Sequence, residues 1–110
     1  MKNYHELIKK ATEGFNLDVY RDEYEGEDSE YFVWNFSNIS GNTFADDEET
    51  SAEIELQLHG FFSKKRVPEK ILPDIKKNLI DLGFSNPEMR ALYESDTKKR
   101  HLIWEMTYIE

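Results

Sequence analysis

Apolar and polar residues alternate through the middle of the chain in a pattern typical of a β-strand. Residues 52–59 are Ala-Glu-Ile-Glu-Leu-Gln-Leu-His, so an extended backbone places the four apolar side chains on one side and the polar side chains on the other. The preceding segment 31–36, Tyr-Phe-Val-Trp-Asn-Phe, is strand-like and strongly aromatic. Together the two segments predict a sheet with one buried face and one charged, solvated face.

The connection between these two strands is predicted to be a polar, acidic loop from Ser37 to Thr50. It is far longer than the two residues that a tight hairpin needs. A small protein that keeps such a loop is expected to use it for contact with a partner.

An N-terminal helix is predicted from Tyr4 to Glu13. Asn3 can cap it, Glu6 stands at the position that completes a capping box, and Gly14 supplies a left-handed stop. Its apolar positions recur at helical spacing: Tyr4, Leu7, Ile8 and Ala11.

A second helix is predicted to begin at Pro68 and to end at Gly83. Pro73 lies near its start, where a missing hydrogen-bond donor matters least. An apolar stripe with a period of about 3.6 residues follows one side of this helix: Ile71, Ile75, Leu79 and Leu82.

The remaining segments complete an α-β-β-β-α-β-β order. Short strands are predicted at 15–20, 31–39, 51–62, 89–93 and 101–109, with an acidic loop at 21–30. Runs of strands broken by two helices predict an α+β fold, an antiparallel sheet with both helices packed on one face. The length of 110 residues predicts a single domain covering residues 1–110.

Composition indicates in which cellular compartment the protein is expected. The chain has no cysteine, which excludes disulfides and thiolate chemistry, and it has no apolar run resembling a secretion signal or the ~20-residue stretch of a membrane span. We therefore expect a soluble protein that is cytosolic at synthesis. The net charge of −9 is uneven: residues 1–55 hold 4 basic and 15 acidic residues, and residues 56–110 hold 10 and 8.

Little in the sequence indicates catalysis, a metal or a cofactor. His5, His59 and His101 have no metal-site spacing and are expected to be solvated. The four consecutive acids Asp46, Asp47, Glu48 and Glu49 lack the alternating ligands and the glycine of a calcium loop. No phosphate loop or nucleophile elbow occurs. The chain is therefore predicted to have no catalytic residue, no metal ligand and no cofactor.

Two basic triplets, Lys64-Lys65-Arg66 and Lys98-Lys99-Arg100, could meet a phosphate backbone, but the overall negative charge opposes general nucleic-acid binding. The aromatic side chains of the strands are expected to fill the core rather than to stack on bases.

Several segments, in this order, resemble the small tail-completion, or tail-terminator, proteins of long-tailed bacteriophages and prophages. The resemblance covers most of the chain. It comprises the N-terminal helix, the strand 31–34, the acidic turn 43–48 running into the strand 52–58, a charged helix over 71–82, and the closing aromatic strand 101–108. Phe61-Phe62 departs from the strand end typical of that family.

The resemblance implies a structural protein of the virion rather than an enzyme. It implies a protomer that forms a hexameric ring at the head-proximal end of the tail tube, made in the host cytoplasm and then part of the tail. The expected partners are other copies of the chain, the tail-tube protein and a head-completion protein. DNA would pass through the lumen without specific binding, and no membrane is involved.

Charge placement suggests which residues touch a partner. A lumen lined with carboxylates repels phosphate. We therefore expect the 22–30 loop, the 42–50 loop with Asp46, Asp47, Glu48 and Glu49, or both, to face the lumen or a neighbour. Lys64, Lys65 and Arg66 are then expected to meet an acidic patch on the adjacent copy, in a head-to-tail contact that closes a ring.

Two other classes of protein stay open. One is a small acidic inhibitor or immunity-type protein that mimics nucleic acid and binds a basic enzyme; it would be a stable monomer with its acids on one face. The other is an uncharacterised enzyme or ligand-binding domain, which would have a concave apolar pocket with converging polar groups.

Overall fold

A computed structural model describes residues 1–41 and 52–110 of the chain. Its elements follow the order α-β-β-β-α-β-β, with a short 3₁₀ helix, η1, after the first α-helix. Their bounds are α1 Tyr4–Thr12, η1 Glu13–Phe15, β1 Val19–Arg21, β2 Tyr31–Gly41, β3 Ala52–Ser63, α2 Pro68–Asp81, β4 Glu88–Glu94 and β5 Lys99–Ile109. The predicted α+β class and element order are confirmed.

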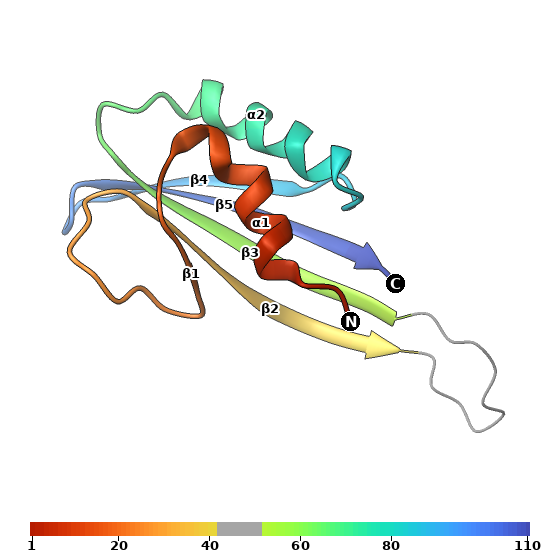
Figure 1. Ribbon diagram of the computed structural model, residues 1–110. Coiled ribbons are helices and arrows are strands. Elements are labelled where there is room, and N and C mark those ends of the chain that lie inside the picture. Colours follow the sequence, from red (N-terminus) through yellow and green to blue (C-terminus); the bar gives the residue numbers. More distant parts are fainter. Residues whose placement is uncertain (42–51) are drawn as a thin grey trace, which may run out of the picture.

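One five-stranded sheet organises the molecule, with strand order β1-β2-β3-β5-β4. Figure 1 shows α1 and α2 side by side on the same face of this sheet, which we call the covered face; the other we call the open face. Four strands pair antiparallel, as predicted, but β1 runs parallel to β2, so the sheet is mixed. The parallel pair forms because the long connection 22–30 carries the chain back along the sheet before β2 begins.

The core lies between the sheet and the two helices. At its centre the register aligns Trp34, Leu58 and Trp104 on neighbouring strands, and all three are at most 1% exposed. Ile54, Leu56 and Leu58 are fully buried, as the alternation in β3 predicts. The Trp104 indole donates a hydrogen bond to the carbonyl of Leu72 at 3.2 Å, which ties β5 to α2.

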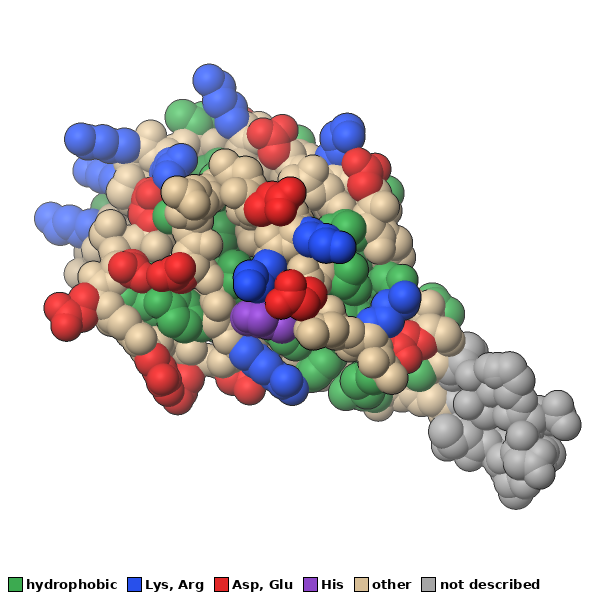
Figure 2. Space-filling view, viewed as in Figure 1, with side chains coloured by type: hydrophobic (Ala, Val, Ile, Leu, Met, Phe, Trp, Pro, Cys, Tyr) green, Lys and Arg blue, Asp and Glu red, His purple; other side chains and the backbone are tan. Residues whose placement is uncertain are grey.

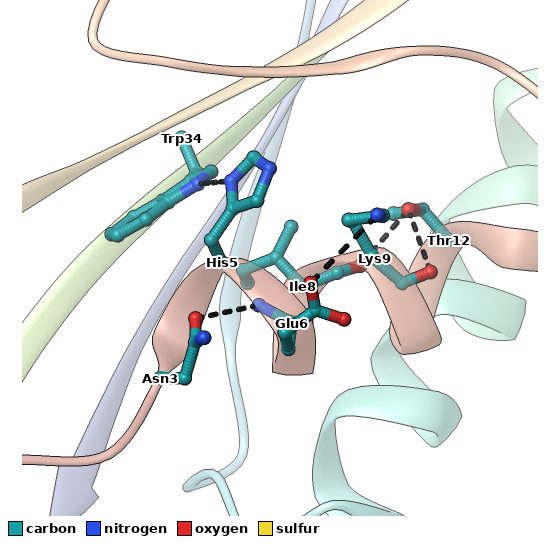
Figure 3. Close-up of polar contacts among 7 residues, drawn as sticks. All are labelled: Asn3, His5, Glu6, Ile8, Lys9, Thr12 and Trp34. Atoms are coloured by element: carbon teal, nitrogen blue, oxygen red, sulfur yellow. Dashed lines mark hydrogen bonds and ion pairs between the residues drawn. The ribbon is translucent and has the colours of Figure 1, made fainter.

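Helix α1 begins as the sequence predicts. The Asn3 side chain accepts a hydrogen bond from the Glu6 backbone N–H at 3.1 Å, and the buried Thr12 hydroxyl donates to the Ile8 carbonyl at 2.9 Å (Figure 3). On the sheet side of the helix, the Trp34 indole donates to His5 Nδ1 at 2.9 Å. These contacts fix the helix against β2.

Helix α2 buries Ile71, Ile75 and Leu79 and tolerates Pro73 in its first half. Gly83 ends it with a φ of 106°, a backbone conformation that side chains with a Cβ rarely adopt. The Asn78 side chain donates to the Ala11 carbonyl at 2.9 Å and so joins the two helices.

Several predicted boundaries differ from the structure. Gly14 does not end the first helix in a left-handed conformation: it lies in η1, and the left-handed residue is Asn16, with a φ of 54°. The strand predicted at 15–20 is shorter, because Phe15 lies in η1 and packs edge-on against Phe32 instead of extending β1. The loop predicted from Ser37 overlaps the end of the strand predicted at 31–39. In the structure residues 37–41 belong to β2, and residues 38–41 pair with β3 after a bulge at Ser37. These five residues are exposed, so apolar alternation does not mark where the strand ends.

Candidate protein-interaction surface

The open face of the sheet is the most distinctive surface of the described part of the chain. No helix within residues 1–41 and 52–110 covers it, and side chains from four strands form cross-strand rows on it. The first row, which we call the aromatic row, is Tyr31, Phe61, His101 and Leu92. The second row is Val33, His59, Ile103 and Arg90. The third row is Asn35, Gln57, Glu105 and Glu88.

The aromatic row is stacked nearly continuously. Tyr24, from the connection before β2, lies 3.7 Å from the Tyr31 ring with almost parallel planes; Tyr31 stacks on Phe61 at 4.9 Å. Phe61 stacks on His101 at 4.2 Å, and the row ends at Leu92, which is 50% exposed. An apolar strip with an exposed end, rimmed by polar groups, is a form typical of a protein contact surface.

A polar network that sequence reasoning missed joins side chains of all three rows and Glu94 at the end of β4. His59 Nδ1 lies 2.8 Å from His101 Nε2, and His101 Nδ1 lies 3.3 Å from Glu94 Oε2. Gln57 links His59, at 3.2 Å, to Glu105, at 2.7 Å. The prediction of solvated histidines is therefore wrong for these two side chains, because the antiparallel register of β3 and β5 brings them together on the open face.

Burial sets the protonation of this pair. Desolvation, the neighbouring His101 and Arg90 lower the pKa of His59 to about 4, and Glu105 opposes the shift. Desolvation also lowers the pKa of His101, although Glu94 favours its charged form.

The third histidine has a different role. His5 is half-buried and accepts a hydrogen bond from the buried Trp34 indole, so it belongs to the packing of α1 on the sheet (Figure 3).

Opposite charges flank the open face. Figure 2 shows basic side chains gathered at the end of the molecule that carries the β3–α2 connection and the β4–β5 turn, with acidic side chains below them over the β1–β2 connection. The acids of residues 22–30, which we call the acidic connection, are almost all exposed: Asp22, Glu23, Glu25, Glu27 and Asp28. We call the basic residues of the two turns the basic cluster: Lys64, Lys65, Lys98, Lys99 and Arg100. A hydrogen bond from Arg100 Nε to the Lys64 carbonyl, 3.1 Å, joins the two turns.

The residues predicted to contact a partner have different environments in the structure. Lys64 and Lys65 are exposed, and their contact with a partner stays a prediction. Arg66 forms a two-point ion pair with Glu30 of the same chain, Nη2 to Oε1 at 2.8 Å and Nε to Oε2 at 3.0 Å, which gives its guanidinium a structural role, and its contact with a partner also stays a prediction. Asp46, Asp47, Glu48 and Glu49 lie outside the described residues.

A cavity of about 280 Å³ opens on the same face, between the acidic connection and the sheet. Asp22, Glu23 and Tyr24 line one side of it, and His59 and His101 line the other. No group of three or more metal-ligating side chains is found among residues 1–41 and 52–110. Within those residues, neither helix is long and apolar enough to cross a bilayer.

Comparison of the chain with known proteins gives no family assignment: no protein-family model matches it, and a search of curated proteins returns no significant match.

Proposed function

We propose that this protein is a ring-forming subunit of the tail-terminator type, which caps the tail tube of a long-tailed phage or prophage and joins it to the head connector. The resemblance to tail-terminator proteins supports the proposal through the order of the helices and strands. The structural observation that carries it is the open face, where the acidic connection adds Tyr24 to a stacked aromatic row and Lys99 of the basic cluster lies 5.0 Å from the Tyr31 ring.

This arrangement suits head-to-tail association of identical copies. The two edges of the sheet differ, because β1 and the acidic connection lie at one edge and β4 lies at the other. A contact between unlike surfaces repeats around a closed ring when the rotation between copies permits. Charge complementarity between the acidic connection of one copy and Lys64 and Lys65 of the next would fix the register of such a contact.

The direct test is co-expression with the tail-tube protein of the same prophage. We expect tubes that end in a ring seen by electron microscopy, and a narrow tube-length distribution that becomes broad when this chain is omitted. An unchanged length distribution with and without the chain, and no co-purification with the tube protein, would exclude the proposal. Subunits of this type can stay monomeric in dilute solution and form the ring on meeting the tube, so the tube protein is present in the assay.

Charge reversal tests the contact between copies. Lys64→Glu combined with Lys65→Glu is expected to abolish ring formation on the tube. Lys9→Glu combined with Lys10→Glu changes the net charge by the same amount at two exposed positions of α1 and is expected to leave ring formation intact. Equal assembly of both double variants would exclude Lys64 and Lys65 from the contact.

The acidic connection favours a second candidate, a small acidic inhibitor of a basic enzyme. Five exposed carboxylates on one short segment resemble the charge density of a nucleic-acid backbone. This candidate predicts a stable one-to-one complex with a basic nuclease or nucleic-acid-binding enzyme and loss of that enzyme's activity. The terminator proposal predicts neither result, so a pull-down from lysate with wild type and an Asp22→Asn, Glu23→Gln, Glu25→Gln variant separates the two.

A further inference from the structure

The histidine pair on the open face has an unusual arrangement of hydrogen-bonding groups. His59 comes from β3 and His101 from β5, in adjacent cross-strand rows, so the two imidazoles meet along a diagonal. Each ring turns one nitrogen inward, and these two nitrogens, His59 Nδ1 and His101 Nε2, are 2.8 Å apart.

The outward nitrogen of each ring faces a group that can only accept. His101 Nδ1 faces the Glu94 carboxylate at 3.3 Å, and a carboxylate that is ionised has no hydrogen to donate. His59 Nε2 faces the Gln57 carbonyl oxygen at 3.2 Å. The orientation of that amide is set on its other side, because Gln57 Nε2 donates to Glu105 Oε2 at 2.7 Å. Both outward nitrogens therefore carry the N–H hydrogen of their ring.

A neutral imidazole has only one N–H. With that hydrogen directed outward on both rings, His59 Nδ1 and His101 Nε2 present two lone pairs to each other at 2.8 Å. Such a contact is repulsive unless a cation lies between the nitrogens. From this geometry we propose that His59 and His101 bind a divalent transition-metal ion of the zinc and copper type through Nδ1 and Nε2.

The surroundings of the pair match those of known metal-binding histidines. Such a histidine generally donates its other ring N–H to a carboxylate or carbonyl oxygen, which fixes the tautomer and the ring orientation. Glu94 and Gln57 hold these two positions here. Phe61 also stacks on the His101 ring at 4.2 Å and restricts its rotation.

A metal ion fits between His59 Nδ1 and His101 Nε2 once the two rings move slightly apart. Two nitrogen ligands at ~2.0–2.1 Å in tetrahedral geometry lie roughly 3.3 Å apart, so the rings need to separate by about half an ångström. The remaining ligands are expected to be water, since the cavity of about 280 Å³ reaches both histidines. Asp22 and Glu23 line the same cavity and offer carboxylates on the side of the acidic connection.

The proposal goes beyond the proposed function and does not depend on it. With two protein ligands rather than four, the expected affinity is moderate, with a Kd on the order of 1–100 µM.

Zinc titration of the full chain without a polyhistidine tag tests the proposal by calorimetry at pH 7.5. Magnesium at a concentration of a few millimolar in the buffer occupies weak carboxylate sites elsewhere. We expect one zinc ion per chain. His59→Asn and His101→Asn are each expected to weaken binding at least about 30-fold, and Glu94→Gln, which removes the carboxylate behind His101, about 10-fold. His5→Asn is the matched control and is expected to bind as the parent does, because His5 is hydrogen-bonded to Trp34 instead.

Nitrogen-15 NMR of the histidine side chains identifies the ligand atoms directly. Zinc is expected to shift His59 Nδ1 and His101 Nε2 and to leave His5 unchanged. Backbone spectra of the variants show whether each is folded, and the parent's own histidine shifts give the answer even if one variant is not. Absence of zinc binding up to 1 mM, or binding equally strong in the His59→Asn variant, would overturn the proposal. A third hydrogen seen between the two rings at pH 7.5, with no displacement by zinc, would overturn it in favour of a shared proton.

Discussion

Arg66 and Glu30 form a two-point ion pair that joins the basic turn after β3 to the last residue of the acidic connection. The Glu30 carboxylate accepts from Arg66 Nε and Nη2, and also from the Ser63 backbone N–H at 2.9 Å. The Glu30 side chain is 16% exposed, while Arg66 is 39% exposed and lies over the Phe62 ring. The two charged segments of the chain are thus fixed to each other within one protomer, and Lys64 and Lys65 project beside this anchor.

Acid should weaken the fold through this pair. The hydrogen bonds from Arg66 lower the pKa of Glu30 to about 2, against about 4.5 in the unfolded chain. A carboxyl group whose pKa is lower in the folded protein stabilises the fold at pH values above its pKa in the unfolded chain. That stabilisation is lost as the pH falls from about 4.5 toward 2. Since Arg66 is partly exposed, we expect Glu30→Gln to cost about 1–2 kcal/mol at pH 7.

Urea unfolding of the parent and of Glu30→Gln at pH 7 and at pH 2.5 checks this prediction. The stability difference between the two proteins should shrink at the lower pH. Glu25→Gln removes the same charge from an exposed position of the acidic connection and should change stability by less than about 0.5 kcal/mol. A difference for Glu30→Gln that is the same at both pH values would show that the ion pair does not contribute.

Gly60 is required by the aromatic packing of the covered face. A Cβ at this position would lie 2.5 Å from the Phe62 ring and 3.1 Å from the Phe32 ring. Both rings are fully buried, so neither can move away freely. Gly60→Ala is therefore expected to destabilise the protein by about 1–3 kcal/mol through overpacking.

Gly14 offers a matched control for Gly60, because a Cβ there would meet no atom within 4 Å. Gly14→Ala is expected to be neutral or stabilising by up to about 1 kcal/mol, since it reduces the freedom of the unfolded chain. Thermal unfolding of both variants measures the contrast. Equal melting temperatures would mean that the space around Gly60 adjusts without cost.

The sequence pattern located helices and strands correctly where buried side chains recur at a regular spacing. The alternation of Ile54, Leu56 and Leu58 located β3 and its buried face, and the stripe through Ile71, Ile75 and Leu79 located α2, because all six side chains face the core. Where no burial accompanies the strand, the pattern disappears. The end of β2 beyond the predicted limit at residue 39 is exposed, and backbone pairing of Ser40 and Gly41 with β3 places no requirement on residue type.

The open face shows a second limit of sequence reasoning. His59 and His101 are 42 residues apart, and only the register of β3 against β5 brings their rings into contact. The pairing of Arg66 with Glu30 likewise depends on where two connections end in space. The sequence therefore indicated a basic triplet, but not that Arg66 forms an ion pair within its own chain. Strand register is set by the whole sheet and cannot be obtained from either strand alone.

A side-chain hydrogen bond adds to the apolar contact between the two helices. Asn78 of α2 donates to the carbonyl of Ala11, near the end of α1, where helix carbonyls lack partners within the helix. Asn78→Ala leaves that carbonyl without this donor and is expected to cost about 1–2 kcal/mol. Asn86→Ala, at an exposed position after α2, should cost less than about 0.5 kcal/mol. Denaturant unfolding measures both, and a cost for Asn78→Ala no larger than that for Asn86→Ala would contradict the prediction.

Association of copies should depend on the exposed end of the aromatic row. Leu92 is 50% exposed on the open face, whereas Ile80 is 42% exposed on α2, so the two residues are matched in size and exposure but lie on different surfaces. If the open face contacts a neighbour or the tail tube, a carboxylate at position 92 is buried on assembly without a partner, which is costly. Leu92→Glu is expected to prevent ring formation on the tube without lowering the melting temperature, and Ile80→Glu is expected to assemble normally. Electron microscopy of both variants with the tube protein gives the comparison, and rings formed by Leu92→Glu at the parent's frequency would place the contact on another surface.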